Sequence, residues 1–203
     1  MQSTSDWLPL APPAQLDARS VVLTRVSPAD IPDIVDAVNE TLDTLRLWMP
    51  WAQTPATTDS IATYVQEATS HWEGFQAFQY VLRDAATSRV AGAAGLHNRM
   101  DEGTLEIGYW VCASFQRRGV ATQAARRLTE AALALPGVTT VAIRCDRENH
   151  ASAGVPAKLG YRLDRIAPSE CGQTDHTSGE MMVWLADHHT CGNEGHPSSV
   201  GHP

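Results

Sequence analysis

The chain has 203 residues, of which 43% are apolar and 19% charged, and this excludes an intrinsically disordered protein. A chain of this length can bury a sizeable core without a metal or disulfide. The formal net charge of −8 argues against nonspecific binding to nucleic acid or to an anionic membrane, because both need clustered cations. The sequence contains no run of about 18 apolar residues, so no membrane span is expected.

The termini and the cysteines predict a single domain in the cytoplasm. Cysteines 112, 145, 171 and 191 are scattered, and this favours reduced thiols over a disulfide framework or a structural zinc site. Residues 1–20 contain several prolines and no apolar core of signal-peptide length, so they are expected to form an arm. Residues 187–203 are rich in His, Gly, Pro and Ser at irregular spacing, which predicts a disordered tail and not a metal site.

The first half of the chain predicts one strand followed by two helices. Residues 21–26 are rich in β-branched side chains and predict a strand. Ser27, Pro28 and Asp30 indicate the start of a helix, which apolar residues at helical spacing continue as far as Pro50. A second helix, capped by Thr58 or Asp59, is predicted to close at Gly74.

From residue 75 the apolar residues take the spacing of strands. Three strands joined by short polar turns are predicted to form an antiparallel meander, at residues 75–83, 89–97 and 104–111. A loop at 115–121 leads into a helix at 122–135. The remaining predicted elements are a strand at 138–145, a short helix at 149–159, and strands at 161–166 and 181–185. Together they indicate a mixed α+β sheet in one domain spanning residues 21–186.

The loop before the helix at 122–135 is suited to a phosphate group. It reads Gln116-Arg117-Arg118-Gly119-Val120-Ala121-Thr122 and joins a strand to a helix N-terminus, where free N–H groups carry partial positive charge. Gly119 would let the backbone approach an anion closely, and Arg117 and Arg118 could add charge-assisted contacts. A plain strand–helix connection with solvated arginines is the alternative. The loop has neither the Gly-Lys-Ser/Thr of a Walker loop nor the Gly-x-Gly-x-x-Gly of dinucleotide-binding folds.

Two motifs resemble those of the GNAT superfamily of acyl-CoA-dependent N-acyltransferases. Gln116-x-x-Gly119-x-Ala121 is similar to the pyrophosphate loop of that superfamily. Asn149-x-x-Ser152, followed by Lys158-Leu-Gly-Tyr161, resembles its second motif. The order of the predicted elements matches as well, over about residues 21–185. The resemblance implies a mostly antiparallel, splayed central β-sheet flanked by helices.

Within the superfamily, the sequence resembles the ribosomal-protein alanine/serine N-acetyltransferases, the RimJ/RimL-type group. Glu106-Ile-Gly-Tyr-Trp-Val111 and Trp48-Met-Pro-Trp51 are typical of that group. The resemblance implies that an acetyl group passes from acetyl-CoA to a primary amine of a protein N-terminus, a peptide or a small molecule, by direct attack in a ternary complex. It implies no metal and is compatible with a homodimer. A noncatalytic CoA-binding sensor or interaction module with the same fold is the alternative function.

The resemblance also assigns roles to individual residues. The residues expected to hold CoA are Trp110, Val111, Cys112, Gln116, Arg117, Arg118, Gly119, Val120, Ala121, Thr122 and Asn149. The end of the strand would bind the pantetheine amides, and the backbone N–H of Val111 would stabilise the thioester oxyanion. Trp48 and Trp51, on either side of Pro50, could line an acceptor pocket or serve in the core.

Two side chains are candidates for proton transfer. Glu106 stands in an apolar strand, where burial would raise its pKa and suit a general base. A structural ion pair, with a water chain as the base, is the alternative. Ser152 could act as the acid for the leaving thiolate, or its hydroxyl could cap the helix. Many superfamily members place a tyrosine acid four positions later, where this chain has Pro156. Cys112 is not expected to form an acyl-enzyme, because the sequence places no activating group beside it.

Overall fold

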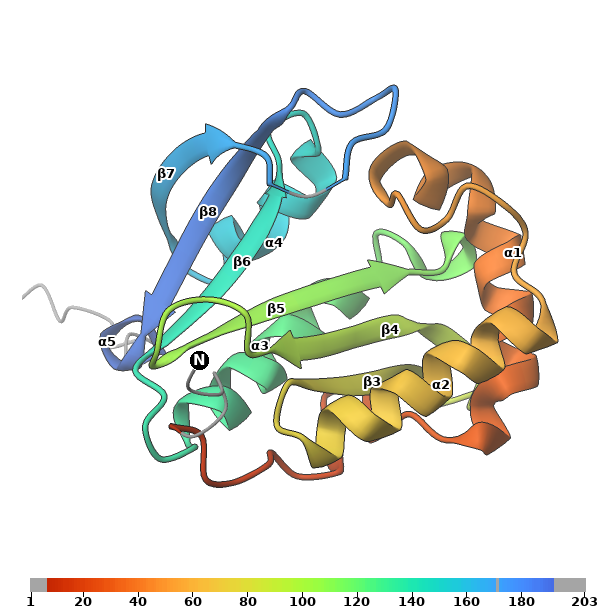
Figure 1. Cartoon of the computed structure of the whole chain (residues 1–203), viewed down its shortest axis with the longest axis horizontal. Helices are drawn as coiled ribbons and strands as arrows, with labels where there is room; N and C mark the ends of the chain where they lie inside the picture. The colour runs from red at the N-terminus through yellow and green to blue at the C-terminus, as the bar shows by residue number, and fades with distance from the viewer. Residues whose placement is uncertain (1–6, 171, 192–203) are drawn as a thin grey trace, which may run out of the picture.

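The computed structural model describes residues 7–170 and 172–191, which form a central sheet with helices on both faces (Figure 1). The sheet has the strand order β1-β2-β3-β4-β5-β6-β8-β7. Its strands are β1 (Gln15–Asp17), β2 (Val21–Arg25), β3 (Ala77–Asp84), β4 (Val90–His97), β5 (Thr104–Val111), β6 (Thr140–Asp146), β7 (Arg162–Pro168) and β8 (Glu180–Asp187). Neighbouring strands run antiparallel except β5 and β6, which run parallel. The predicted mixed, mostly antiparallel sheet is therefore confirmed.

The helices cover the two faces of this sheet. They are η1 (Pro28–Asp30, a 3-10 turn), α1 (Ile31–Trp48), α2 (Thr58–Glu73), η2 (Ala113–Phe115, a second 3-10 turn), α3 (Val120–Leu133), α4 (His150–Lys158) and α5 (His188–Cys191). Figure 1 shows α1 and α2 on one face and α3 on the other. In the part of the chain described, no helix is both long enough and apolar enough to cross a bilayer.

The elements predicted between residues 21 and 185 are all present, with ends shifted by a few residues. Two segments outside this range differ from expectation. β1 lies within the expected N-terminal arm, where Leu16 is buried and the strand pairs with β2. α5 lies within the tail expected to be disordered, where His189 and Thr190 donate backbone hydrogen bonds to the Asp187 carboxylate. The remainder of that tail, 192–203, is outside the described residues.

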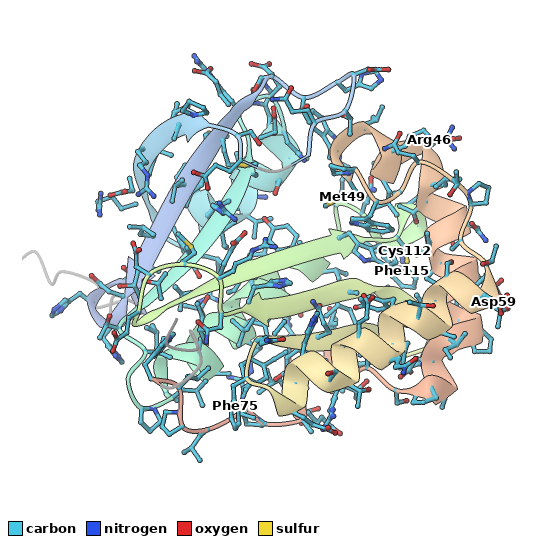
Figure 2. All side chains as sticks on the ribbon, viewed as in Figure 1. Arg46, Met49, Asp59, Phe75, Cys112 and Phe115 are labelled. Carbon is cyan, nitrogen blue, oxygen red and sulfur yellow. The ribbon has the colours of Figure 1, made fainter. Side chains whose placement is uncertain are left out.

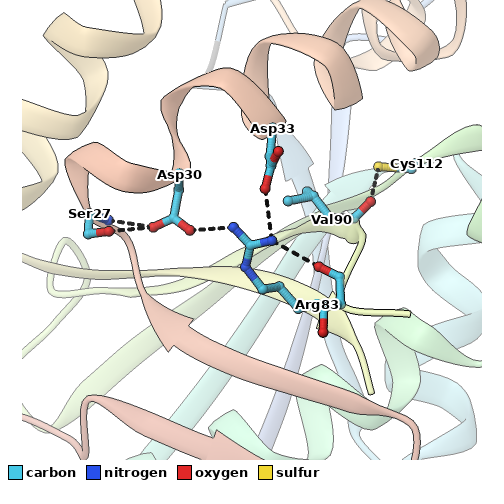
Figure 3. Close-up of polar contacts among 7 residues, drawn as sticks. Ser27, Asp30, Asp33, Arg83, Val90 and Cys112 are labelled. Carbon is cyan, nitrogen blue, oxygen red and sulfur yellow. Dashed lines mark hydrogen bonds and ion pairs between the residues drawn. The ribbon is translucent and has the colours of Figure 1, made fainter. Parts of the chain in front are cut away.

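A charged cluster fixes the start of α1 against the sheet. The backbone N–H and hydroxyl of Ser27 donate to the Asp30 carboxylate at 2.8 Å, as expected of a helix start. Asp30 is buried and lies 2.6 Å from the guanidinium of Arg83 on β3, which also contacts Asp33 at 2.9 Å (Figure 3). Because buried charges need partners, this cluster fixes the position of the start of α1 against β3.

The sheet divides into two parts beyond the middle of β5. β5 pairs with β6 only from Thr104 to Ile107, opposite Thr140 to Ile143. Beyond this point β5 continues along β4 to Val111, whereas β6 continues along β8 to Asp146. Figure 1 shows the resulting opening between β5 and β6. The splayed sheet expected from the resemblance is therefore present.

Candidate active site

The opening between β5 and β6 leads into a cavity of about 830 Å³. Its wall includes Trp48 at the end of α1 and Trp51 from the segment after it, as well as Tyr64 of α2. Trp51 is 55% exposed. Figure 2 shows Met49, which also lines the cavity, on the inner side of this segment, whereas the exposed Arg46 points away. The two tryptophans therefore lie on one wall of the cavity, and their contact with an acceptor stays a prediction.

A loop from the other end of the chain covers part of the same cavity. The Thr174 hydroxyl, between β7 and β8, donates to the Leu47 carbonyl at the end of α1 over 2.6 Å. Gly172 packs so closely on Pro50 that an added Cβ would lie 3.2 Å from the proline ring. Gly172 and Thr177 of this loop line the cavity. This contact joins residues more than 120 positions apart, so no local pattern could have predicted it.

Backbone groups at the end of β5 face the opening. The Cys112 N–H donates to the Ala91 carbonyl over 2.9 Å and is not available to pantetheine, which corrects the role predicted for it. Successive strand residues direct their N–H groups to opposite sides, so the N–H of Val111 faces the side that β6 has left. The Val111 carbonyl accepts a hydrogen bond from the Gln116 amide at 3.4 Å.

The Cys112 side chain is a protonated thiol in the core. It donates to the Val90 carbonyl at 3.4 Å (Figure 3) and lies near Phe115 beside α1 (Figure 2). Burial raises its pKa to about 12. A thiol with so high a pKa is a poor nucleophile, which agrees with the expectation that it forms no acyl-enzyme.

The loop before α3 presents free donors and cations at the surface. Gly119 has φ of +77° and is the residue immediately before α3. No side chain caps the N-terminus of this helix. The first-turn N–H groups of Val120, Ala121 and Thr122 therefore have no cap, and the helix begins two residues earlier than predicted. Arg117 and Arg118 are both exposed. This arrangement fits the diphosphate of CoA, because uncapped donors and two cations meet at one point.

Glu106 is held in a buried ion pair with two arginines. Its carboxylate accepts from Nε and Nη2 of Arg99, each over 2.8 Å, and from Nη2 of Arg144 over 2.9 Å. Burial raises the pKa of this carboxyl, but the hydrogen bonds from Arg99 and Arg144 together lower it by more than burial raises it. The pKa of Glu106 therefore lies below its ordinary value. The predicted raised pKa is therefore wrong, and the alternative of a structural ion pair describes the contacts observed.

His97 is a cavity residue that the sequence did not reveal. It stands opposite Glu106 on β4 and lines the cavity. The imidazole fits against β5 because residue 108 is glycine, where an added Cβ would lie 3.3 Å from His97 Nε2. Burial, together with the charge of Arg99, lowers the pKa of His97 to about 4. The imidazole is therefore neutral near pH 7.

α4 brings Asn149 and Ser152 to the cavity, where a tyrosine meets them. The Asn149 side chain accepts from the Ser152 backbone N–H at 3.1 Å, so the predicted helix cap is present. The Ser152 hydroxyl is not a cap. It lies 3.1 Å from the Tyr109 hydroxyl, and this hydroxyl also donates to the Ser152 carbonyl at 3.1 Å. Sequence reasoning missed Tyr109, because no short-range pattern joins β5 to α4.

The described residues contain no group of three or more His, Cys, Asp or Glu side chains arranged to hold a metal ion. His188 and His189 of the expected tail are exposed in α5. The other histidines of the tail lie outside the described residues.

The splayed sheet, the uncapped helix after it and the cavity are the features that the resemblance to the GNAT acyltransferases implied. Residues 20–162 match the family model described as "Acetyltransferase (GNAT) domain". This chain belongs to the GNAT acetyltransferase family, which confirms the resemblance seen in the sequence.

Two known relatives agree with this membership, and one solved structure shares the fold. The chain is 29% identical over 114 residues to "Uncharacterized N-acetyltransferase YjdG" of Bacillus subtilis, covering 56% of this chain and 60% of that protein. It is 26% identical over 150 residues to "Putative ribosomal N-acetyltransferase YdaF" of the same organism, covering 70% and 77% of the two chains. The structure of Mycobacterium smegmatis RimJ in complex with CoA-disulfide has a TM-score of 0.78 and 18% identity, over 89% of this chain and 91% of that chain. That last likeness concerns the fold.

Proposed function

We propose that this protein transfers an acetyl group from acetyl-CoA to a primary amine, either a protein N-terminal α-amine or the amine of a peptide or small molecule. The observation that carries the proposal is the separation of β5 from β6 after Ile107, beside the uncapped start of α3. It leaves the Val111 N–H directed into the opening, between a surface that fits a diphosphate and a cavity that could admit an amine.

The residues proposed to hold acetyl-CoA fall into two groups. The exposed loop from Gln116 to Gly119 and the first turn of α3 would bind the diphosphate through N–H groups, Arg117 and Arg118. The edge of β5 would bind the pantetheine arm, and the Val111 N–H would stabilise negative charge on the thioester oxygen. Bound acetyl-CoA supplies an activated acyl carbon, and the chain supplies position and donors.

Direct attack requires the bonds and protons to balance. The neutral amine forms the C–N bond, the C–S bond breaks, and its electron pair moves to sulfur. The amine gives up a proton and the thiolate gains one. We propose cavity water as the immediate proton acceptor, because the hydrogen bonds from Arg99 and Arg144 outweigh burial and lower the pKa of Glu106. Glu106 would then serve by keeping Arg99 and Arg144 in place. Ser152 would donate a hydrogen bond to the leaving thiolate, which takes its proton from water.

The acceptor is proposed to enter beside Trp48 and Trp51. These aromatic side chains line the wall formed by the α1–α2 segment, across the cavity from β6 and α4.

The cytoplasm is proposed as the compartment, because Cys112 and Cys145 are both free thiols in the described structure.

Thiol release from acetyl-CoA tests this function, using peptides with different N-terminal residues and a panel of small primary amines. Calorimetry with CoA is the second measurement. We expect CoA binding together with turnover of at least one class of amine. CoA binding without turnover of any amine would favour the noncatalytic alternative, and no CoA binding would contradict both.

A further inference from the structure

Tyr109 and Ser152 form a pair across the opening. Tyr109 lies on β5, and its hydroxyl oxygen is 3.1 Å from both the carbonyl oxygen and the hydroxyl oxygen of Ser152 on α4. Its single proton can be shared between these two acceptors, which leaves the Ser152 proton free for another partner. Both residues line the cavity. Burial raises the pKa of Tyr109, so its hydroxyl remains protonated across the neutral pH range. The tyrosine is therefore a permanent hydrogen-bond donor to Ser152.

Ser152 and Cys145 of β6 both line the cavity. Burial raises the pKa of the Cys145 thiol to about 11, and the nearby Ser152 hydroxyl opposes that rise. In α4, which spans His150–Lys158, Ser152 is the sole side-chain hydroxyl. A serine hydroxyl in a helix otherwise rotates freely or bonds back to the preceding turn. The contacts from Tyr109 restrict that freedom.

We propose that Tyr109 is a positioning residue for acetyl transfer, which holds Ser152 so that the serine proton is directed at a sulfur atom in the opening. During the reaction this sulfur would be that of CoA. As the C–S bond breaks and its electron pair moves to sulfur, Ser152 donates a hydrogen bond to the developing thiolate, and the neutralising proton arrives from water. Tyr109 transfers no proton itself. This inference rests on the proposed function.

The kinetic test compares Tyr109→Phe, Ser152→Ala and the double variant. Each single change is expected to lower kcat by roughly tenfold or more, the effect of a lost hydrogen bond to a charged group. The KM for acetyl-CoA should stay within about twofold of wild type, because the interaction acts in the transition state. The double variant should be no slower than Ser152→Ala, because the tyrosine acts through the serine.

Tyr80→Phe is the matched control. It also removes a tyrosine hydroxyl that donates to a backbone carbonyl, that of Pro13 over 2.8 Å, but Tyr80 does not line the cavity. We expect this variant to keep wild-type kcat even where its melting temperature falls. Calorimetry with CoA should show unchanged affinity for Tyr109→Phe and Ser152→Ala, which verifies that both variants are folded.

A second readout needs no turnover. Alkylation of Cys145 by a small haloacetamide, in the absence of CoA, is followed by peptide mass spectrometry. Ser152→Ala and Tyr109→Phe should both slow alkylation by about twofold to tenfold at pH 8, because the sulfur loses a donor and its thiol pKa rises.

Three results would each overturn the role of Tyr109. They are a wild-type kcat in Tyr109→Phe, a double variant whose loss equals the product of the single losses, and slower alkylation in Ser152→Ala but not in Tyr109→Phe. Failure of the proposed function is distinguishable from these. If the wild-type protein acetylates no amine, the proposed function fails, while the alkylation rates still decide whether Tyr109 positions Ser152.

Discussion

The guanidinium of Arg99 faces the carboxylate of Glu106 along one edge, with Nε and Nη2 each 2.8 Å from a different oxygen. Arg144 adds a third donor at 2.9 Å from the far side. The Glu106 side chain is 4% exposed, whereas that of Arg99 is half exposed at 50%. A carboxylate held in this way is anchored, and the hydrogen bonds from the two guanidinium groups lower its affinity for a proton.

Glu106→Gln is therefore expected to affect stability more than chemistry. Removing one partner of a buried ion pair leaves the other charge unpaired, so the free energy of unfolding should fall by about 3 kcal/mol in urea titrations. The value of kcat should fall by less than about tenfold between pH 6 and 9. A loss of about a hundredfold, largest at acidic pH, would restore Glu106 as the general base.

The same ion pair predicts a loss of stability in acid. Because the folded-state pKa of Glu106 is lowered, its contribution is fully present above the unfolded-state value of about 4.3 and is lost as pH falls through the folded-state pKa. The free energy of unfolding should therefore fall less between pH 6 and pH 2 for Glu106→Gln than for wild type. An equal fall in both proteins would mean that the carboxylate is not paired in solution.

His97 should titrate far below the usual range of histidine. Burial and the charge of Arg99 hold its pKa at about 4, so proton NMR should show a neutral imidazole at pH 6. The unfolded chain takes up this proton near pH 6.5, so stability is lost as pH falls from about 6.5 towards 4. A His97→Gln variant should lose less stability over that window. A titration midpoint near 6.5 would show that the imidazole is solvated.

Changes in the loop before α3 should weaken CoA binding. Gly119→Val places a β-branched residue at φ of +77°, and the double change of Arg117 and Arg118 to Ala removes two exposed cations. Each should weaken acetyl-CoA binding at least tenfold, or about 1.4 kcal/mol, in calorimetry. The control removes the same charge from the far edge of the sheet by changing Arg162 and Arg165 to Ala. Equal losses in both double variants would indicate a general charge effect.

The tryptophans are expected to divide into two classes. Trp48→Ala and Trp51→Ala should raise the KM of the acceptor and leave CoA affinity unchanged, because both line the cavity. Trp72→Ala should instead lower the free energy of unfolding by about 3 to 5 kcal/mol. Trp72 is 6% exposed and packs edge-on against Phe78 and Tyr80, with centroid distances of 5.2 Å. An unchanged acceptor KM in both cavity variants would remove them from the acceptor site.

The sequence alone was sufficient to predict the elements between residues 21 and 185 and the loop that precedes α3. Periodicity and turn residues place β5 over Thr104–Val111, because strand and helix spacing are local properties of the chain. The cap on α4 was predictable for the same reason, since Asn149 and the N–H it accepts are three residues apart. Gly119 marks the left-handed residue before α3, where a side chain would be strained.

Only the tertiary structure decided the charges and contacts inside the opening. The sequence shows Glu106 in an apolar strand, but its pKa depends on Arg144, which β6 brings alongside β5 from 38 positions away. In the same way, Tyr109 and Ser152 meet because the sheet divides and α4 packs against the open side. Electrostatic shifts and hydroxyl contacts depend on distances of a few ångströms between distant segments, and such distances exist only once the chain has packed.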